Sequence, residues 1–184
     1  MATRDAFANQ IQNRNFLSPA GFKFSLAKNN KVSFFANSCR IPDISLGTAV
    51  QATYLKDIDV PGEKIEYENL SVRFLVDEDL RNYMAIHNWM TGIGYPESLG
   101  DFKTEVTKSD GSRDLNQQFS DGSLTIQNSN YRTSAIVRFK DLFPIALTSL
   151  EFDTGVTDIQ YFTAEATFKY LVYNIVAKDG RTRL

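Results

Sequence analysis

Three neighbouring stretches decide the fold: IDVPGEK at residues 58–64, LSVRFLV at 70–76 and DEDLRNYMAIHNWM at 77–90. The middle stretch alternates large apolar residues with others, so it predicts a buried strand with Leu70, Val72, Phe74 and Val76 on one face. The acidic cluster after it predicts a helix over 79–91. Either Asp77 or Asp79 would cap that helix, since carboxylates suit its positive end.

The predicted helix carries a broad apolar stripe. At helical spacing the stripe comprises Leu80, Tyr83, Met84, His87 and Met90, widened by Ile86 and Trp89. We expect Trp89 to pack the helix onto the sheet. Gly92 is placed to end the helix.

Upstream of the strand, residues 46–68 predict a β-hairpin that projects from the core. Pro61-Gly62 fits the central positions of a type II turn, because proline presets its φ and glycine tolerates positive φ. The arms, roughly 49–55 and 65–68, carry few large apolar residues, so a partner would have to cover them. Asp57 and Asp59 are either solvated or salt-bridge partners of a neighbouring subunit.

The rest of the chain supplies further strands. Alternation at 22–26 and 32–36 around Asn29-Asn30 predicts a second hairpin, and strands are expected at 123–127, at 134–142 before Pro144, and around 147–152. A last strand over 160–176 exceeds the usual length, which indicates a bend or an extension beyond the domain. Its Tyr161, Tyr170 and Tyr173 are candidates for a subunit interface.

Seven or more strands with one substantial helix predict a mainly β fold: a β-sandwich or partly closed β-barrel with a projecting β-hairpin. The length of 184 residues suits a single domain, 1–184. Residues 1–16 read as a polar N-terminal arm that orders against a neighbour, 97–122 as a long polar loop or insertion, and 177–184 as a basic, frayed C-terminal tail.

Composition narrows the function classes. The formal net charge of −2 lacks the basic excess of a tight nucleic-acid binder, although it does not say which face carries which charge. A single cysteine, Cys39, excludes an internal disulfide and reads as a structural thiol. No stretch reads as a signal peptide or a membrane span, so we expect a cytosolic chain without a membrane anchor.

Chemistry-bearing motifs are absent from the sequence. The only histidine, His87, lies on the helix stripe and reads as a packed or interface residue. No phosphate loop, zinc-ligand spacing or dinucleotide fingerprint occurs, so we expect no catalytic residues, metal or cofactor. Hydrolase activity lost on His87→Ala or Asp79→Asn would reopen the enzyme class.

The turn Val60-Pro61-Gly62, the strand 70–76, the acidic 77–79 and the helix ending in Trp89 resemble the tail tube proteins of contractile, T4-like bacteriophages. The strand that runs into Asp141-Leu142-Phe143-Pro144 and the early 22–41 segment fit the same pattern. Tube proteins of type VI secretion share the fold.

The resemblance implies a self-assembling, late structural protein of the virion, put together in the host cytoplasm. It implies hexameric rings, stacked around a channel for DNA ejection, in which genomic DNA passes without specific binding. The hairpin (Asp57, Asp59, Val60, Pro61, Gly62, Glu63, Lys64) would contact the adjacent ring. The helix with Tyr83 and Trp89 would face the tail sheath. Baseplate and tail terminator proteins would be further partners.

Two other functions stay open at this point. One is a baseplate or tail-end ring protein of the same fold, which would initiate or terminate the tube and form one ring. The other is a monomeric β-sandwich binding module. Sequence alternation defines two faces of each strand without labelling either as the channel wall.

Overall fold

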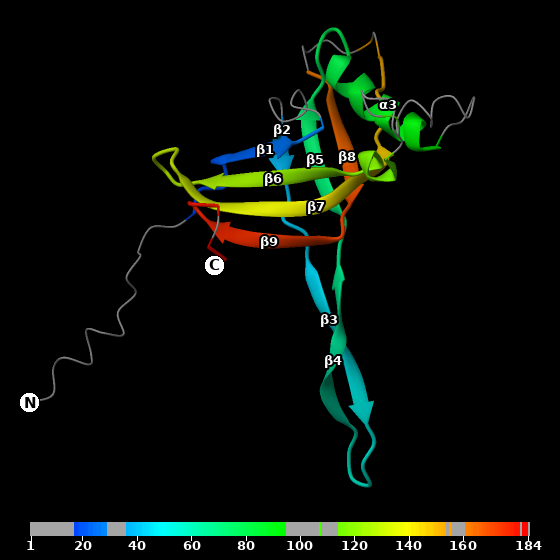
Figure 1. Cartoon of the computed structure of the whole chain (residues 1–184), viewed down its shortest axis with the longest axis vertical. Coiled ribbons are helices and arrows are strands. Elements are labelled where there is room, and N and C mark those ends of the chain that lie inside the picture. Colours follow the sequence, from blue (N-terminus) through cyan, green and yellow to red (C-terminus); the bar gives the residue numbers. More distant parts are fainter. Residues whose placement is uncertain are drawn as a thin grey trace, which may run out of the picture.

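The computed structural model describes residues 17–28, 36–94, 107, 114–153, 155, 161–180 and 182–183. Its elements in chain order are β1 (Phe22–Leu26), β2 (Ala36–Cys39), β3 (Ile44–Gln51), β4 (Ile58–Tyr67), β5 (Leu70–Leu75), α3 (Arg81–Gly94), the 3-10 turn η1 (Leu115–Gln118), β6 (Ser120–Gln127), β7 (Thr133–Leu147), β8 (Thr163–Lys169) and β9 (Val172–Ala177). Figure 1 shows a body of two β-layers with α3 at one end and the β3–β4 hairpin projecting from the other.

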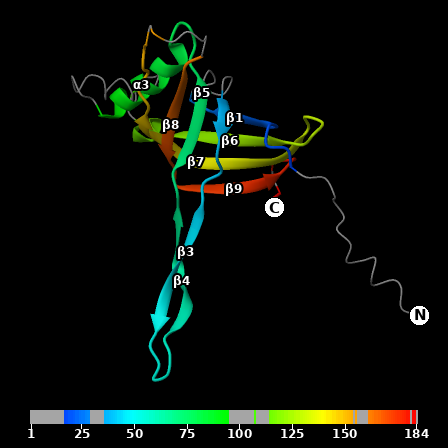
Figure 2. The same ribbon diagram turned by 180° about the vertical axis from the view of Figure 1, so that it is seen from behind.

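The two layers share one strand. β1, β6, the first part of β7 and β9 form sheet A, and β2, β5, β8 and the last part of β7 form sheet B. All these pairings are antiparallel. The strands of one layer cross those of the other in both views (Figures 1 and 2). The fold is therefore mainly β, an open sandwich with one α-helix among the described residues, as the sequence predicts.

β7 changes partners at a corner. It pairs with β6 and β9 up to Leu142, then with β8 from Phe143 to Leu147. Asp141 turns the chain with a φ of 54°, and the register shifts between Pro144 and Ala146. Pro144 therefore sits at a bulge, where a missing N–H is tolerated, instead of ending the strand as predicted.

The core lies between the two layers. Fully buried side chains come from both sheets, and the helix adds Ile86 and Trp89. The largest are Phe24, Phe74, Phe139, Phe168, Leu26, Leu70, Ile86 and Leu142. The predicted inward face of 70–76 is confirmed for Leu70, Val72 and Phe74, whereas Val76 is only partly buried.

Asn82 fastens the start of α3 to the end of β5. Its amide donates to Leu75 O at 2.6 Å, and its Oδ1 accepts from the N–H groups of Asp77 (3.1 Å) and Tyr83 (2.8 Å). The start of α3 differs from the predicted carboxylate cap: Asn82 bonds the backbone groups there, and Asp79 pairs with Arg81 at 3.0 Å on the surface. The side chain of Asn82 is fully buried, so it satisfies the backbone groups that an exposed cap would leave to water.

The helix spans 81–94 instead of 79–91, and its buried face differs from the predicted stripe. Asn82, Ile86 and Trp89 are buried, whereas Met84 and His87 are exposed. The helix continues through Gly92 to Gly94. Trp89 packs onto the sheet as expected: its ring lies 6.3 Å from that of Phe168, and its Nε1 donates to Gln118 O at 2.9 Å.

The other predicted strands have different outcomes. β1 pairs with β6 and β2 pairs with β5. The predicted hairpin partner of 22–26 falls on residues 32–35, which lie outside the described residues, so that pairing stays a prediction. The long last strand is two strands, β8 and β9, separated at Tyr170–Leu171, so the bend is the correct alternative. No strand occurs at 148–153.

The structure describes part of the predicted C-terminal tail but not the predicted N-terminal arm. Residues 1–16 and most of 97–122 lie outside the described residues; of the latter, β6 already begins at Ser120. The C-terminal tail is not frayed where it is described. Ala177 N–H donates to Thr182 O at 2.7 Å, Asp179 accepts from Thr182, and Arg183 bridges back to Val176.

Candidate assembly site

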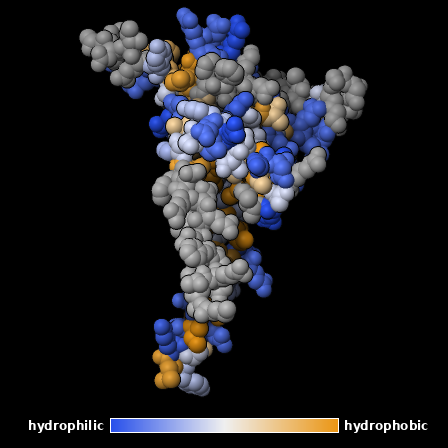
Figure 3. Space-filling model, turned by 90° about the vertical axis from the view of Figure 1, so that its left-hand side faces the viewer, coloured by the Kyte–Doolittle hydropathy of each residue, from blue (hydrophilic) through white to orange (hydrophobic). Residues whose placement is uncertain are grey.

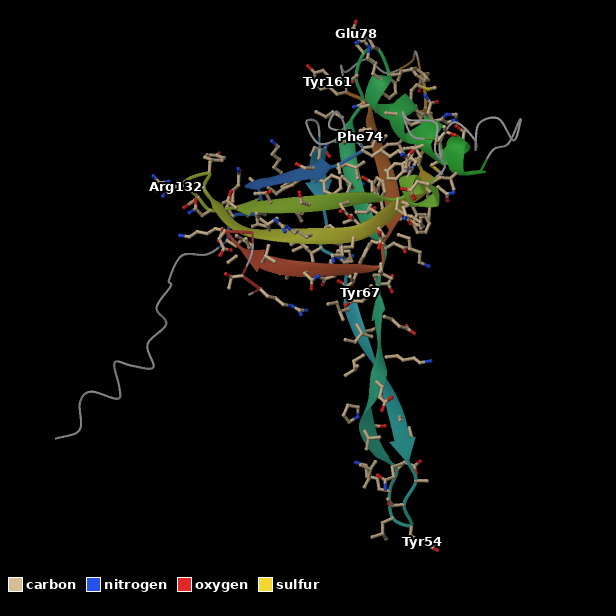
Figure 4. The ribbon with its side chains drawn as sticks, viewed as in Figure 1. Tyr54, Tyr67, Phe74, Glu78, Arg132 and Tyr161 are labelled. Carbon is tan, nitrogen blue, oxygen red and sulfur yellow. The ribbon has the colours of Figure 1, made fainter. Side chains whose placement is uncertain are left out.

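The β3–β4 hairpin is the part of the structure that stands apart from the body. Among the described strands, β3 and β4 pair only with each other, from Ile44↔Tyr67 at the root to Gln51↔Ile58 near the tip. Tyr54 lies at the far end and Tyr67 at the root (Figure 4). A two-stranded ribbon is marginal in water, so this shape is typical of an element that is completed by a partner.

The turn of the hairpin lies at 52–57, which corrects the prediction of a turn at Pro61-Gly62. Pro61 and Gly62 lie within β4, at a register shift opposite Gly47. A Cβ on Gly62 would stand 2.5 Å from Gly47 O, so glycine is required there by a close backbone approach. Proline is tolerated because bulges leave an N–H unpaired.

Apolar side chains are exposed along the hairpin. Cross-strand neighbours Leu46 and Ile65 are 51% and 53% exposed, and Ile44 beside them is 52% exposed. Tyr54 and Leu55 at the tip are almost fully exposed. Figure 3 shows orange apolar groups along the projection and at its tip. Contact with another protein surface would remove this area from water.

The hairpin is also acidic. Asp57, Asp59, Glu63 and Glu66 outnumber Lys56 and Lys64, and none of the six forms an ion pair with a residue that the structure describes. The expected role of Asp57, Asp59, Glu63 and Lys64 in a subunit contact therefore stays a prediction.

An aromatic cluster holds the root of the hairpin against the body. The Tyr67 ring lies 6.0 Å from that of Tyr170 and 5.6 Å from that of Tyr173, in edge-on contacts. Phe139 of β7 lies 5.2 Å from Tyr170. Tyr170 donates its hydroxyl to Glu68 O at 2.9 Å, and Tyr173 donates to Pro42 O at 3.2 Å. These contacts clamp both strands where they leave the body.

Burial raises the pKa of both the Tyr170 and Tyr173 hydroxyls, so they stay protonated donors at physiological pH. Both residues were expected at a subunit interface, and that role stays a prediction. Tyr170 is only 9% exposed and Tyr173 is partly buried, because both rings pack within the chain. Sequence alternation could not distinguish these two uses of an aromatic strand.

The opposite end of the molecule carries the remaining predicted residues. Tyr161 is 82% exposed and lies near Glu78 at this end (Figure 4). Tyr83 on α3 donates its hydroxyl to Thr148 O at 3.1 Å. Phe152 and Phe162 form an exposed ring pair 4.8 Å apart. Tyr161 thus stays a candidate for a subunit contact.

Chemistry is sparse in the described part of the chain. No three His, Cys, Asp or Glu side chains there converge as metal ligands. Burial raises the pKa of the Cys39 thiol to about 12, which makes it a poor nucleophile. His87 is exposed instead of packed. Among the described helices, none has the length and apolarity to cross a membrane.

The family model described as "Phage tail tube protein" matches residues 3–176. The chain belongs to the phage tail tube protein family. It is therefore a structural component of a bacteriophage tail, in agreement with the resemblance of its central stretch.

A curated relative narrows the comparison. The tail tube terminator protein of Enterobacteria phage T4 is 33% identical over 84 residues, covering 42% of this chain and 48% of that protein. The match thus spans about half the length of the relative.

Solved structures share the fold of the whole chain. The tube-terminating cap of the anti-feeding prophage aligns over 96% of this chain and 99% of its own, with a TM-score of 0.63 and 16% identity. The sheath/tube terminator of the PVC extracellular contractile injection system aligns over 90% and 100%, with a TM-score of 0.58 and 17% identity. The PVC sheath–tube complex gives 0.56, so terminator and tube structures both share this fold.

Proposed function

We propose that this protein is the ring subunit that ends the tail tube of a contractile-tailed phage. The observation that carries the proposal is the 33% identity to the T4 tail tube terminator over 84 residues. In this role a hexameric ring docks on the last ring of the tube and stops its growth. The ring would assemble in the host cytoplasm and contact the sheath, and DNA would leave through its channel.

The hairpin supplies the surface that docks on the tube. It combines half-exposed Ile44, Leu46 and Ile65 with an exposed tip, Tyr54 and Leu55. Burying each half-exposed aliphatic side chain would contribute about 1 kcal/mol, so the set could supply several kcal/mol per subunit. The aromatic contacts of Tyr67, Tyr170 and Tyr173 restrict the orientation of the hairpin relative to the body, which lowers the conformational entropy lost on docking.

The second candidate is a subunit of the tube body. It is favoured by the family model, which describes a tail tube protein and spans nearly the whole chain. In a tube-body subunit, the end of the molecule opposite the hairpin would bind the hairpin of another copy. Rings would then stack without limit, because such heterologous contacts build an open filament. A tail-end subunit would form rings that do not stack on one another.

Negative-stain electron microscopy across a concentration series separates the two. We expect single rings at every concentration from the protein alone. When the protein is added to growing tubes of the same phage's tube protein, we expect a ring at one end of each tube and a shorter mean length. Long tubes from this protein alone would instead establish the tube-body function.

Tip variants test the docking surface. The double substitution Tyr54→Ser and Leu55→Ser removes two exposed apolar side chains and no described core contact. We expect intact rings that no longer bind tube ends. Tyr131→Asn is the matched control, because Tyr131 is also exposed (77%) and lies in the β6–β7 turn, away from the hairpin. Equal binding by wild type and tip variant would contradict docking through the hairpin.

A further inference from the structure

The C-terminal turn, residues 177–180 and 182–183, covers part of one edge of sheet A. Among the described strands, β9 pairs only with β7, so its other side forms an edge of the sheet. The chain turns back after Ala177, and Figure 1 shows the C-terminal end beside the arrowhead of β9. Arg183 then lies opposite Val176 as an antiparallel bridge. The returning chain therefore occupies a place where a further strand would lie.

Hydrogen bonds close the turn. The Ala177 N–H donates to Thr182 O at 2.7 Å, and the Gly180 N–H donates to Ala177 O at 2.8 Å. The Asp179 carboxylate accepts from the Thr182 N–H at 3.1 Å and from the Thr182 hydroxyl at 2.7 Å. Gly180 is buried and has a φ of 68°, a conformation that favours glycine. The turn is therefore a defined structure that depends on particular residues.

The bonds of Ala177 show which backbone groups β9 presents at this edge. Its N–H and its C=O both bond the turn, on the side away from β7. Backbone groups alternate in direction along an antiparallel strand, so those of Tyr173 and Ile175 point to the same side. A strand that paired along the whole edge would need the groups of Ala177. It would also need the place of Arg183, because neighbouring strands lie only about 4.8 Å apart.

A second copy of the chain offers a strand that fits this edge. Among the described strands, β1 pairs only with β6, so β1 forms the opposite edge of the same sheet. Three antiparallel pairings separate β1 from β9, so the two strands run in opposite directions. A copy rotated about a ring axis would thus present β1 antiparallel to β9. Phe22 at one edge and Ile175 at the other are only partly buried, and pairing would cover both.

We propose that the C-terminal turn is an autoinhibitory latch, which closes the β9 edge in the free chain and opens when a strand of a second copy pairs there. The latch rests on the proposed function, because it supposes that copies associate into a ring. Lys178, Asp179 and Thr182 are exposed, so opening the turn uncovers little apolar surface. An open edge would also pair with unrelated strands. The closed latch therefore keeps the free subunit from aggregating before it reaches the tube.

Sedimentation velocity of the full chain, at dilutions below those used for microscopy, measures the concentration of half-association. Asp179→Ala removes the two side-chain bonds with Thr182. A net hydrogen bond changes an equilibrium by roughly 2- to 13-fold, and a closed state weakens apparent affinity in proportion to its population. Half-association should therefore need a concentration at least about 5-fold lower than in wild type. Gly180→Val should act in the same direction without a change of charge, because valine is strained at a φ of 68°.

Two control variants isolate the latch. Asp179→Asn removes the same charge but keeps an oxygen that can accept from Thr182, so it should associate as wild type does. Asn128→Ala is the matched control, because its side chain accepts from the N–H groups of Asn130 and Arg132 at 3.0 Å each, in the β6–β7 turn. Circular dichroism melting checks that each variant is folded. Smaller shifts in both latch variants, or an equal shift in Asn128→Ala, would overturn the proposal.

Hydrogen exchange reports on the latch itself. When copies associate, the Gly180 amide should exchange faster, because the turn opens, and the Tyr173 and Ile175 amides should exchange more slowly, because the edge gains a partner. A Gly180 amide that stays equally protected would show that the turn remains closed and would overturn the proposal. Variants and wild type that all stay monomeric would overturn it too. Rings that show both exchange changes yet do not end tubes would refute only the proposed function.

Discussion

Gly62→Ala and Gly47→Ala form a matched pair within one ribbon. The two glycines face each other at the register shift of the hairpin, and neither has a left-handed φ. A Cβ on Gly62 would stand 2.5 Å from Gly47 O and 2.8 Å from Gly47 C, both backbone atoms. A Cβ on Gly47 would meet only Lys64 O, at 3.7 Å, an ordinary contact.

The expected destabilisation by Gly62→Ala follows from the distance between the added Cβ and Gly47 O. Relieving the Gly62→Ala clash from 2.5 Å to the 3.4 Å of ordinary contact moves one backbone against the other by nearly an ångström. Overpacking of this kind costs about 1–3 kcal/mol. The cost falls on the hairpin, which pairs with no other described strand, so we expect little change in the melting temperature of the body.

Hydrogen exchange measures this directly. In Gly62→Ala the amides of 44–51 and 58–67 should exchange roughly 5- to 150-fold faster, which corresponds to that loss of local stability. Binding to tube ends should weaken over the same range. Gly47→Ala should leave exchange unchanged or slower, because alanine restricts the unfolded chain more than glycine does. Equal exchange rates in the two variants would refute the close-approach argument.

Four further predictions concern the body. Trp89→Ala should destabilise the protein by about 3–5 kcal/mol in urea unfolding, because the ring is 4% exposed; an unchanged midpoint would place Trp89 outside the core. Asn82→Ala should cost about 1–3 kcal/mol, since it leaves partly buried backbone groups at the start of α3 without their partner. A loss below about 0.5 kcal/mol would contradict that role. Hydrogen bonds from Ser71 and Arg73 lower the pKa of Glu165 in the folded protein. The ionised carboxylate therefore stabilises the fold above its unfolded pKa, and this stabilisation is lost as the pH falls through the lower folded pKa. Glu165→Gln should reduce the fall in melting temperature on the acid side of a pH profile, and a profile identical to wild type would contradict this role. Cys39 should react with a thiol reagent at pH 8 far more slowly in the native than in the unfolded protein, because burial raises its pKa to about 12; equal rates would show that the thiol is accessible.

Sequence reasoning succeeded where the signal is local. The strand at 70–75 was predicted from its alternation, Trp89 from its place on the helix, and the projecting hairpin from the poverty of large apolar residues in its arms. Each of these depends on residues within a few positions of one another. The family resemblance was recognised from the same central stretch, and the family model matches residues 3–176.

The failures have a common physical cause. Alternation says that Phe22 and Phe24 share a face, but not that β1 pairs with β6, whose partner residues, such as Ile126, lie far away in the sequence. Pro61-Gly62 and Pro144 are ordinary turn or stop signals, yet both occur at bulges, where tertiary packing overrides local preference. The contacts of Tyr170 and Tyr173 at the root of the hairpin depend on which side of a strand is buried.

The pairing order also constrains synthesis. β1 can form its backbone hydrogen bonds only after β6 has been synthesised, and β5 can pair with β8 only after β8 has been synthesised. While the chain emerges from the ribosome, two strand pairs can form by local contact, the β3–β4 hairpin first and the β6–β7 hairpin later. The nascent protein therefore exposes unpaired apolar strands until its last quarter is made. Truncation before Thr163 should yield insoluble fragments, and chaperones that cover strand edges should raise the yield of the full chain.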